Sequence, residues 1–501
     1  MRPQSGLPVE NLRRYRHPAT LAGFPEVPAG EAEECRDHST YRGNMSLTNP
    51  SITIIGAGGF VFPFRLIGDL LSFPALQSAR LVLMDLDAGR LSRTATAARA
   101  LRDHHGLKTE IIETTDRREA LTGADFVIIT FQVGGVEAYR HDVEIPRKYG
   151  VDQTVGDTVG PGGVFRFLRS VDPYAAIAAD ALELCPDATF INYANPMAMA
   201  TGFLNAQGVK TVGLCHSVQG TTRMLARALD VPYEELDYVS AGINHQAWLL
   251  ELKHKGEDLY PKLHEVMAAK HVRGRGAADA ESDDGDHSGV AGADSDYEGA
   301  NEQVRTTIME TFGYFQTESS HHASEYLPYF RKTPEKVREY IPVRWDYYEI
   351  CSAHDEQGDI DDQLARLKDT LEPSLEYGAM IVNAMVTGVP TVIYGNVPNA
   401  GLISNLPAEA TVEVACLVDR NGVQPVALGA LPPQLAAVNR TNINVQVLAL
   451  EAALTGNREN VHHAVALDPL TSAQLTLEEA HAMTEELFEA HRDRLPAALR
   501  N

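Results

Sequence analysis

Cysteine, histidine and asparagine side chains that could bind a metal ion or a polar substrate occur in three short motifs. NYANPMAMAT contains Asn195, GLCHSVQGT contains Cys215 and His216, and GINHQAW contains Asn244 and His245. A thiolate and an imidazole together suit a borderline divalent cation. Cys215 and His245 are therefore candidate metal ligands. The motifs alone leave a second interpretation open, in which Cys215 is a small buried hydrophobe and His245 is a hydrogen-bonded core histidine.

A glycine-rich turn follows the first strongly apolar segment. Residues 52–55 lead into GAGGF, where the absence of side chains lets backbone N–H groups and a helix N-terminus approach a pyrophosphate. The candidate dinucleotide-binding residues of this turn are Gly56, Gly58, Gly59 and Phe60. The complete fingerprint has a third glycine where Val61 stands. An ordinary strand-to-helix turn therefore remains the alternative.

Two later segments are compatible with the same nucleotide. The run LVLMDLD contains Asp85, which is placed to accept hydrogen bonds from ribose hydroxyls and would select NAD over NADP. Asp87 competes for that role, and its alternative is a cap of the next helix. The run ADFVIIT leads into FQVGG, where Gln132 and Gly134 are expected to line the nicotinamide side of the cleft.

The elements that must position these residues alternate between short apolar runs and helical stretches. This pattern predicts an α/β fold with a Rossmann-like, doubly wound dinucleotide-binding domain over residues 49–215. A mixed α+β domain that carries the catalytic and substrate residues is expected over 216–501. Residues 1–48 are interpreted as a disordered N-terminal extension, and the acidic, Gly-rich segment 273–300 as a disordered insertion.

Charge and hydropathy narrow the possible partners. The formal net charge of −25 disfavours nucleic acid and anionic membrane surfaces, and a small-molecule substrate fits better. No run approaches the roughly 18 apolar residues of a membrane helix. The N-terminus does not read as a secretory signal, and the 5 scattered cysteines suit reduced thiols, so a cytoplasmic protein is expected.

Nine motifs in order resemble glycoside hydrolase family 4, over about residues 50 to 500. They are GAGG, DTVGPGGVFR, NPMAMAT, CHSVQGT, GINHQAW, GYFQTESSHHASEY, VIYGNV, VEVACLVD and RTNINVQ. The resemblance implies an NAD-dependent enzyme with a lactate/malate dehydrogenase-like architecture, in which Cys215 and His245 hold a catalytic divalent cation, usually Mn2+. His216, directly after the cysteine, resembles the α-galactosidase branch, since the phospho-glycosidase branches carry an aspartate there.

The resemblance also implies the reaction. An α-galactoside such as melibiose would be oxidised at C3 by NAD+, lose the C2 proton, eliminate the leaving group, add water and be reduced again; this family is a known exception to the two-carboxylate scheme. A homodimer or homotetramer is expected. The alternatives are an α-galacturonidase or α-glucosidase of the same family, a 2-hydroxy acid dehydrogenase, or an NAD-responsive protein without catalysis.

A tyrosine is the base that the family leads us to expect. Tyr314 in GYFQTESS is the first candidate and Tyr326 in SEYLPYF the second. The alternative for each is a packing aromatic residue with a hydrogen-bonded hydroxyl. The candidate acids that protonate the leaving oxygen are His216 and Asp157.

Three further residues are candidates for holding sugar hydroxyls. The amides of Asn195 and Asn244 can both donate and accept hydrogen bonds, and their alternative is turn formation. Arg166 in PGGVFRFL could hold a hydroxyl or pair with an acid. Asp157, just before this stretch, could instead cap the helix that begins there.

Overall fold

The computed structural model describes residues 49–59, 61–276, 302–342, 344–353 and 356–500. The predicted extension over 1–48, most of the predicted acidic insertion and Phe60 lie outside the described residues. Helix α9 runs to Gly276, so the first four residues of the segment predicted as a loop, 273–276, are helical.

The described strands form one mixed 13-stranded sheet in the order β10-β8-β7-β12-β11-β6-β5-β4-β1-β2-β3, with β13 beside β12 and β9 beside β8. The strands are β1 (Ser51–Ile55), β2 (Arg80–Met84), β3 (Glu110–Thr114), β4 (Phe126–Ile129), β5 (Thr189–Asn192), β6 (Thr211–Gly213), β7 (Leu236–Ile243), β8 (Gln246–His254), β9 (Glu257–Asp258), β10 (Phe315–Gln316), β11 (Thr391–Pro398), β12 (Thr411–Asp419) and β13 (Gly422–Pro425).

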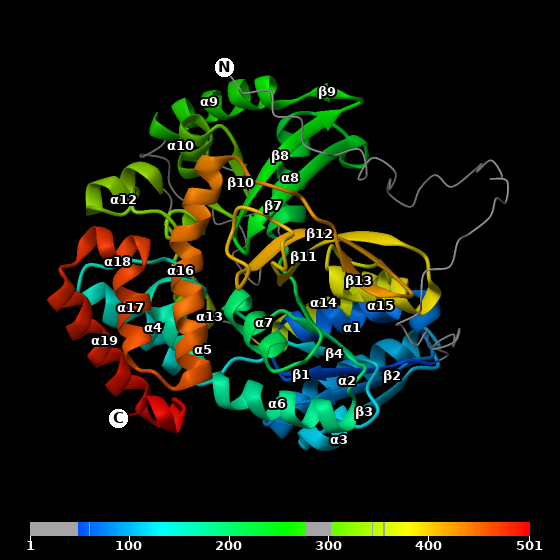
Figure 1. Ribbon diagram of the computed structural model, residues 1–501. Helices are drawn as coiled ribbons and strands as arrows, with labels where there is room; N and C mark the ends of the chain where they lie inside the picture. Colours follow the sequence, from blue (N-terminus) through cyan, green and yellow to red (C-terminus); the bar gives the residue numbers. More distant parts are fainter. Residues whose placement is uncertain (1–48, 60, 277–301, 343, 354–355, 501) are drawn as a thin grey trace, which may run out of the picture.

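The helices surround this sheet (Figure 1). They are α1 (Val61–Ser72), α2 (Ala88–His104), α3 (Arg117–Leu121), α4 (Gly135–Lys148), α5 (Gly160–Leu168), α6 (Val171–Leu184), α7 (Met197–Ala206), α8 (Ser217–Ala228), α9 (Tyr260–Gly276), α10 (Gln303–Phe312), α11 (Ser320–Ala323), α12 (Pro334–Tyr340), α13 (Tyr347–Ser352), α14 (Glu356–Asp369), α15 (Tyr377–Thr387), α16 (Pro433–Thr455), α17 (Glu459–Leu467), α18 (Pro469–Gln474) and α19 (Leu477–His491). Among the described residues, no helix is long and apolar enough to cross a membrane.

Strands β1 to β6 are all parallel, in the order 3-2-1-4-5-6 of a doubly wound dinucleotide-binding sheet. Alternate residues point to opposite faces. Ile52 and Ile54 of β1 lie in the core that α1 and α2 cover, whereas Val127 and Ile129 of β4 lie in the core on the other face, under α5 and α6. These buried apolar runs explain the near-continuous hydrophobicity of the strands. The predicted fold class is confirmed.

The antiparallel half continues the same sheet and adds no separate one. Asn396 of β11 pairs with Gly213 of β6, and β12, β7, β8 and β10 follow. The predicted division at residue 215 falls just after β6, where the chain leaves the parallel half. The motifs after β4, β5 and β6 all emerge at the carboxyl edge of the parallel strands, which is where such sheets bind ligands.

Candidate functional site

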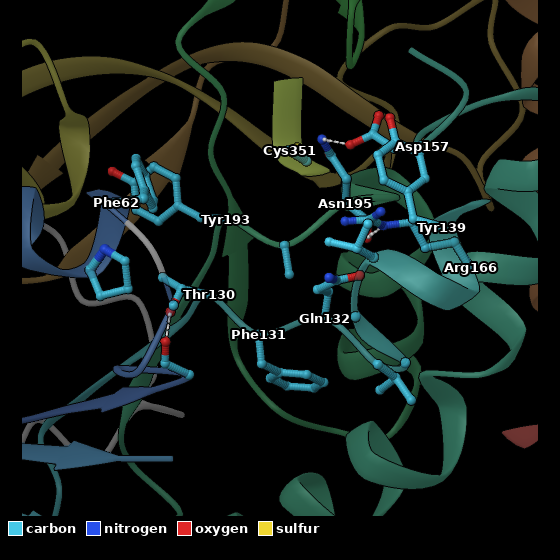
Figure 2. Close-up of a pocket in the computed structure, with 18 of the residues that line it drawn as sticks. Phe62, Thr130, Phe131, Gln132, Tyr139, Asp157, Arg166, Tyr193, Asn195 and Cys351 are labelled. Atoms are coloured by element: carbon cyan, nitrogen blue, oxygen red, sulfur yellow. Dashed lines mark hydrogen bonds between the residues drawn. The ribbon is translucent and has the colours of Figure 1, made fainter. Parts of the chain in front are cut away.

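A cavity of about 730 Å³ opens at the carboxyl edge of the parallel strands. Its wall includes the β1–α1 turn, the loop after β4, the loops after β5 and β6, and α13. Figure 2 shows Phe62 and Tyr193 on one side of this space, Gln132 near the middle, and Asp157, Asn195 and Arg166 on the other side. This volume suits a drug-sized ligand, since small-molecule sites span roughly 300–1,000 Å³.

Two glycines of the β1–α1 turn lie where residues from the loops after β4 and β2 approach the turn most closely. Gly56 has φ +94°, and a Cβ there would lie 2.6 Å from the backbone nitrogen of Phe131. A Cβ on Gly58 would lie 2.9 Å from Asp85 Cγ. Both glycines and Gly59 line the cavity. A turn without side chains lets a pyrophosphate approach the backbone closely.

Asp85 and Asp87, which follow β2, make different contacts. Asp85 lines the cavity, accepts a hydrogen bond from the N–H of Gly58 at 2.9 Å, and is therefore fixed against the glycine turn. Asp87 caps α2 by accepting from the N–H groups of Gly89 and Arg90 at 2.9 and 3.0 Å. Only Asp85 is thus positioned both on the turn and on the cavity wall as a ribose-binding acid would be.

The loop after β4 supplies the opposite wall of the same nucleotide space. Gln132 and Gly134 line the cavity, and Gly134 has φ +91° as the N-cap of α4. The carbonyl of Val133 accepts a hydrogen bond from Arg169, whose guanidinium also forms a fully buried ion pair with Asp142 at 2.6 Å. The buried pair anchors the loop, because α4 and α5 must both hold their positions for it to form.

Cys215, His245 and Glu318 converge on one point of the cavity wall. The Cys215 sulfur lies 3.0 Å from Nε2 of His245, and that nitrogen lies 3.6 Å from the Glu318 carboxylate. One ligand atom from each residue lies within 4.8 Å of the others. Thiolate, imidazole and carboxylate form a coherent donor set for a divalent transition-metal ion.

The backbone at this cluster is strained. His245 and Glu318 have φ angles of 60° and 77°, which non-glycine residues seldom adopt. His245 occupies the second position of the two-residue turn between β7 and β8, after Asn244. Such conformations persist where the surrounding structure holds them, and they concentrate at functional sites. The surrounding structure therefore holds two of the three candidate ligands in an uncommon backbone conformation.

Electrostatics at the cluster favour a bound cation. Burial raises the pKa of the Cys215 thiol well above its usual value, and the charges of Glu318 and Glu413 raise it further. Burial also raises the pKa of Glu318, but the charges of His245 and His322 outweigh it and the pKa is lowered. A divalent ion beside the sulfur would reverse the balance at Cys215, because a coordinated thiol loses its proton.

A row of hydrogen-bonded side chains, from His245 through His322 to Glu325, selects the tautomer of His245. His245 Nδ1 lies 2.9 Å from His322 Nε2, and His322 Nδ1 lies 3.2 Å from the Glu325 carboxylate. In the neutral form of His322, Nδ1 donates to the carboxylate, so Nε2 accepts from Nδ1 of His245. Nε2 of His245 then keeps its lone pair for the cluster. Metal-binding histidines are oriented in this way.

Glu325 connects this row of side chains to the loop that carries Asp157. Its carboxylate accepts from the backbone N–H groups of residues 154–156 at 2.7, 2.8 and 3.1 Å. Burial alone would raise the pKa of Glu325, but the hydrogen bond and charge of His322, the charge of Arg331 and the backbone donors place it well below the usual range. One buried carboxylate therefore positions both the cluster and the neighbouring loop.

The predicted sugar-binding residues lie together, with one exception. Asp157 accepts from the side-chain amide of Asn195 at 3.2 Å, and Arg166 donates to the backbone carbonyl of Asn195 at 3.3 Å. All three line the cavity. Helix α5 begins at Gly160 with Val159 as its N-cap, so Asp157 does not cap it. Asn244 is 1% exposed, is not among the lining residues, and its amide has no hydrogen-bond partner among the described residues.

The three candidate acid and base side chains have different surroundings. His216 lines the cavity, with Nδ1 3.7 Å from the buried Glu376 carboxylate. Tyr326 is fully buried, its ring is centred 6.4 Å from that of His245, and its hydroxyl has no hydrogen-bond partner among the described residues. Neither tyrosine is among the residues that line the cavity, and the Tyr314 ring packs against that of Tyr260 at 6.1 Å, next to α9 and α10.

Sequence reasoning missed Glu318, His322, Glu325 and the Trp345–Tyr347 wall. The first three lie in TESSHHASEY, part of a family motif in which only the tyrosines were candidates. Four carboxylate and imidazole groups within residues 318–325 were the available signal. Trp345 stacks on His321 at 4.4 Å and lines the cavity with Tyr347, but no pattern in the sequence marks this segment.

Known proteins have sequences similar to this one over most of its length. An α-galactosidase of Bacillus subtilis (strain 168) is 42% identical over 456 residues, 89% of this chain and 99% of that protein. An α-galactosidase of Rhizobium meliloti (strain 1021) is 35% identical over 89% of both chains. An α-galacturonidase of Bacillus subtilis (strain 168) is 31% identical over 85% of this chain and 94% of its own.

Solved structures and family models agree with these relatives. The putative glucosidase lplD from Bacillus subtilis has a TM-score of 0.74, at 28% identity over 88% of this chain and 99% of its own. A 6-phospho-α-glucosidase from gut microorganisms, solved with NAD and Mn2+, has a TM-score of 0.71 at 20% identity, over 89% and 99%, and shows the fold alone. Residues 51–231 match the family 4 glycosyl hydrolase model, and residues 240–471 match the C-terminal domain of that family. The chain therefore belongs to family 4 of the glycosyl hydrolases.

Proposed function

We propose that this protein is an α-galactosidase that depends on NAD and a divalent cation, with Mn2+ as the expected ion. The observation that carries the proposal is a single cavity lined both by the glycine turn with Asp85 and by the cluster of Cys215, His245 and Glu318. A dinucleotide and a metal ion would then meet the same substrate. The α-galactosidase relatives at 42% and 35% identity supply the sugar class.

The chain provides a place for each group. Gly56, Gly58 and Asp85 would hold the pyrophosphate and ribose of NAD, with Gln132 toward the nicotinamide. Cys215, His245 and Glu318 would hold the cation. When bound, the pair would supply a hydride acceptor for C3 of the sugar and a Lewis acid for its C2 and C3 oxygens.

Tyr326 is the base that we propose for the C2 proton. Burial raises the pKa of Tyr326 well above its usual value, and the charges of Glu318, Asp157 and Cys215 raise it further, so the phenol lies within the field of the groups that define the site. Its hydroxyl has no hydrogen-bond partner among the described residues, so no described protein group competes for the oxygen once the phenol is ionised. The Tyr314 ring instead packs against Tyr260. A cation held by the cluster would favour the phenolate.

His216 is the proposed acid for the leaving oxygen. It lies on the cavity wall next to Cys215, and its Nδ1 lies 3.7 Å from the buried Glu376 carboxylate. Asp157 is then left to bind the sugar together with Asn195 and Arg166. Its two oxygens already accept from Thr158 and Asn195, at 2.6 and 3.2 Å.

A neutral sugar fits the cavity better than a uronate. The positive charge of Arg166 faces the Asp157 carboxyl, whose charge helps to raise the pKa of Arg166 although burial lowers it. The guanidinium is thus already balanced within the site. A uronate would need a further cationic clamp. α-Galacturonidase is therefore the less favoured activity. An α-glucoside differs from an α-galactoside only in the configuration of one hydroxyl.

The test is hydrolysis of p-nitrophenyl α-galactoside under reducing conditions, with and without NAD+ and Mn2+, and with substrate deuterated at C2. We expect activity that needs both additions, a primary isotope effect, and no net formation of NADH. Net NADH would indicate a dehydrogenase instead. Activity indifferent to both additions would overturn the mechanism. Activity confined to the α-glucoside or α-galacturonide would overturn the sugar assignment.

A further inference from the structure

A second group of side chains with metal-ligand chemistry lies on the C-terminal helices. His462 belongs to α17, and His481 and Glu485 belong to α19. One ligand atom from each lies within 4.8 Å of the others, and none of the three lines the cavity. We infer that these residues form a second divalent-cation site, one for Zn2+ or a similar borderline ion.

Helix geometry brings the three side chains together. His481 and Glu485 are four residues apart on α19, so they project from the same face one turn apart. His462 faces them from α17, with its ring stacked on that of His481 at 4.3 Å. His462 Nε2 lies 3.0 Å from Glu485 Oε1. Ligand atoms in a tetrahedral zinc site are separated by about 3.3 Å, as bond lengths of about 2.0–2.1 Å require.

The surroundings hold His462 and Glu485 and leave His481 able to adjust. The His462 side chain is only 10% exposed, and its ring packs against Phe488 at 5.7 Å. Its Nδ1 is buried without a hydrogen-bond partner in the described structure. Arg458 binds Oε2 of Glu485 at 2.7 Å, which orients the carboxylate and leaves Oε1 toward His462. Exposed His481 can then rotate to complete the set.

The donor set determines the class of ion. Two imidazoles and one carboxylate suit Zn2+, Ni2+ or Cu2+, whereas Mg2+ and Ca2+ prefer all-oxygen sites. Solvent would occupy the remaining position. An ion here would link α17 to α19, and both helices pack on α5, which carries Arg166. Its expected effect is therefore on the stability of this helical layer and not on the sugar chemistry.

The experiment measures Zn2+ binding to the full chain by equilibrium dialysis at micromolar free Zn2+. Cys215→Ser removes the cluster in the cavity from the count. We expect this variant to keep one Zn2+ per chain, and the added change His481→Ala to weaken that binding at least tenfold. His463→Ala is the matched control, because exposed His463 neighbours His462 on α17 and is not part of the group.

A stability measurement separates this site from general surface binding. Zn2+ should raise the Tm of Cys215→Ser and of Cys215→Ser with His463→Ala, and leave unchanged the Tm of the variant that also lacks His481. Absence of Zn2+ from the Cys215→Ser chain would overturn the inference. Equal loss of binding in the His463→Ala and His481→Ala variants, or loss in neither, would overturn it as well.

Discussion

At the scale of single residues, Tyr326 and Tyr314 form a matched pair for testing the base. Tyr326→Phe removes a buried hydroxyl that has no hydrogen-bond partner among the described residues. Removing an unsatisfied polar group is neutral or stabilising for the fold. We therefore expect a loss of hydrolysis of at least about 100-fold, the low end of general-base contributions, with no decrease in Tm.

Tyr314→Phe is the control, because its ring packs with Tyr260 outside the cavity. Its rate should stay within a few-fold of the unchanged enzyme. The measurement is kcat with the p-nitrophenyl substrate, together with a thermal scan of both variants. Equal losses in the two variants, or a full rate for Tyr326→Phe, would remove Tyr326 from the reaction.

Part of the site could be predicted residue by residue. The glycine turn, Asp85, Cys215 and His245 carry local signals, because strand-to-helix turns and soft ligands are recognisable in short motifs. Glu318 lies in a run of acidic residues and histidines, but its place beside His245 depends on β10 pairing with β8, which brings residue 316 against residue 248. The sequence alone does not decide between Tyr314 and Tyr326 for the same reason, since no local pattern records that Tyr326 is fully buried near His245 and that Tyr314 packs against Tyr260.

At the scale of elements, β12 carries a buried acid whose ionisation affects folding. Glu413 is fully buried, and burial raises its pKa from 4.5 to about 7, while the charge of His245 and a hydrogen bond from Asn396 partly oppose the shift. The folded pKa lies above the unfolded one. The contribution of Glu413 to stability is therefore fully present below about pH 4.5 and is lost as pH rises toward 7.

Glu413→Gln should remove this pH dependence while keeping an acceptor for Asn396. In metal-free protein, we expect the variant to gain stability relative to the parent between pH 5 and pH 8, by roughly 3 kcal/mol from about 1.4 kcal/mol per pKa unit. Urea unfolding at both pH values measures the difference. A difference between the two proteins that does not change with pH would show that Glu413 does not titrate in this window.

The sequence predicted the positions of individual strands and helices better than it predicted which strands pair. The run LVLMDLD overlaps β2, and the run ADFVIIT contains β4. Local periodicity records burial, so it locates strands and helices. It does not record partners. The antiparallel continuation of the sheet from β6 to β11 joins residues 213 and 396, and no local pattern contains that information.

At the scale of the whole molecule, the sheet is shared by both halves of the chain. The parallel half ends at β6, whose outer edge is covered by β11, and Val212 lies in the same core as Ile393. A fragment of residues 49–231 would expose this edge and its apolar neighbours. Exposed edges and apolar patches promote aggregation. The two matched family regions are therefore expected to fold as one unit.

Expression of residues 49–231 alone tests this expectation. The fragment should be insoluble or bind no NAD+, and the full chain should unfold in one cooperative transition with NAD+ raising its Tm. Sedimentation, NAD+ titration and calorimetry are the measurements. A soluble fragment with full NAD+ affinity would show that the parallel half is an independent domain. Assembly into a homodimer or homotetramer stays a prediction.

The two ends of the β7–β8 hairpin differ in how well they would tolerate an insertion. Its two-residue turn sets the candidate ligand His245 at the cavity, so any added residue there would displace the ligand. At the opposite end, Lys255 and Gly256 form an exposed turn before β9, where even a Cβ on Gly256 would meet nothing within 4 Å. Lineages that lengthen this chain, and engineers who attach a label to it, have the second turn available and not the first.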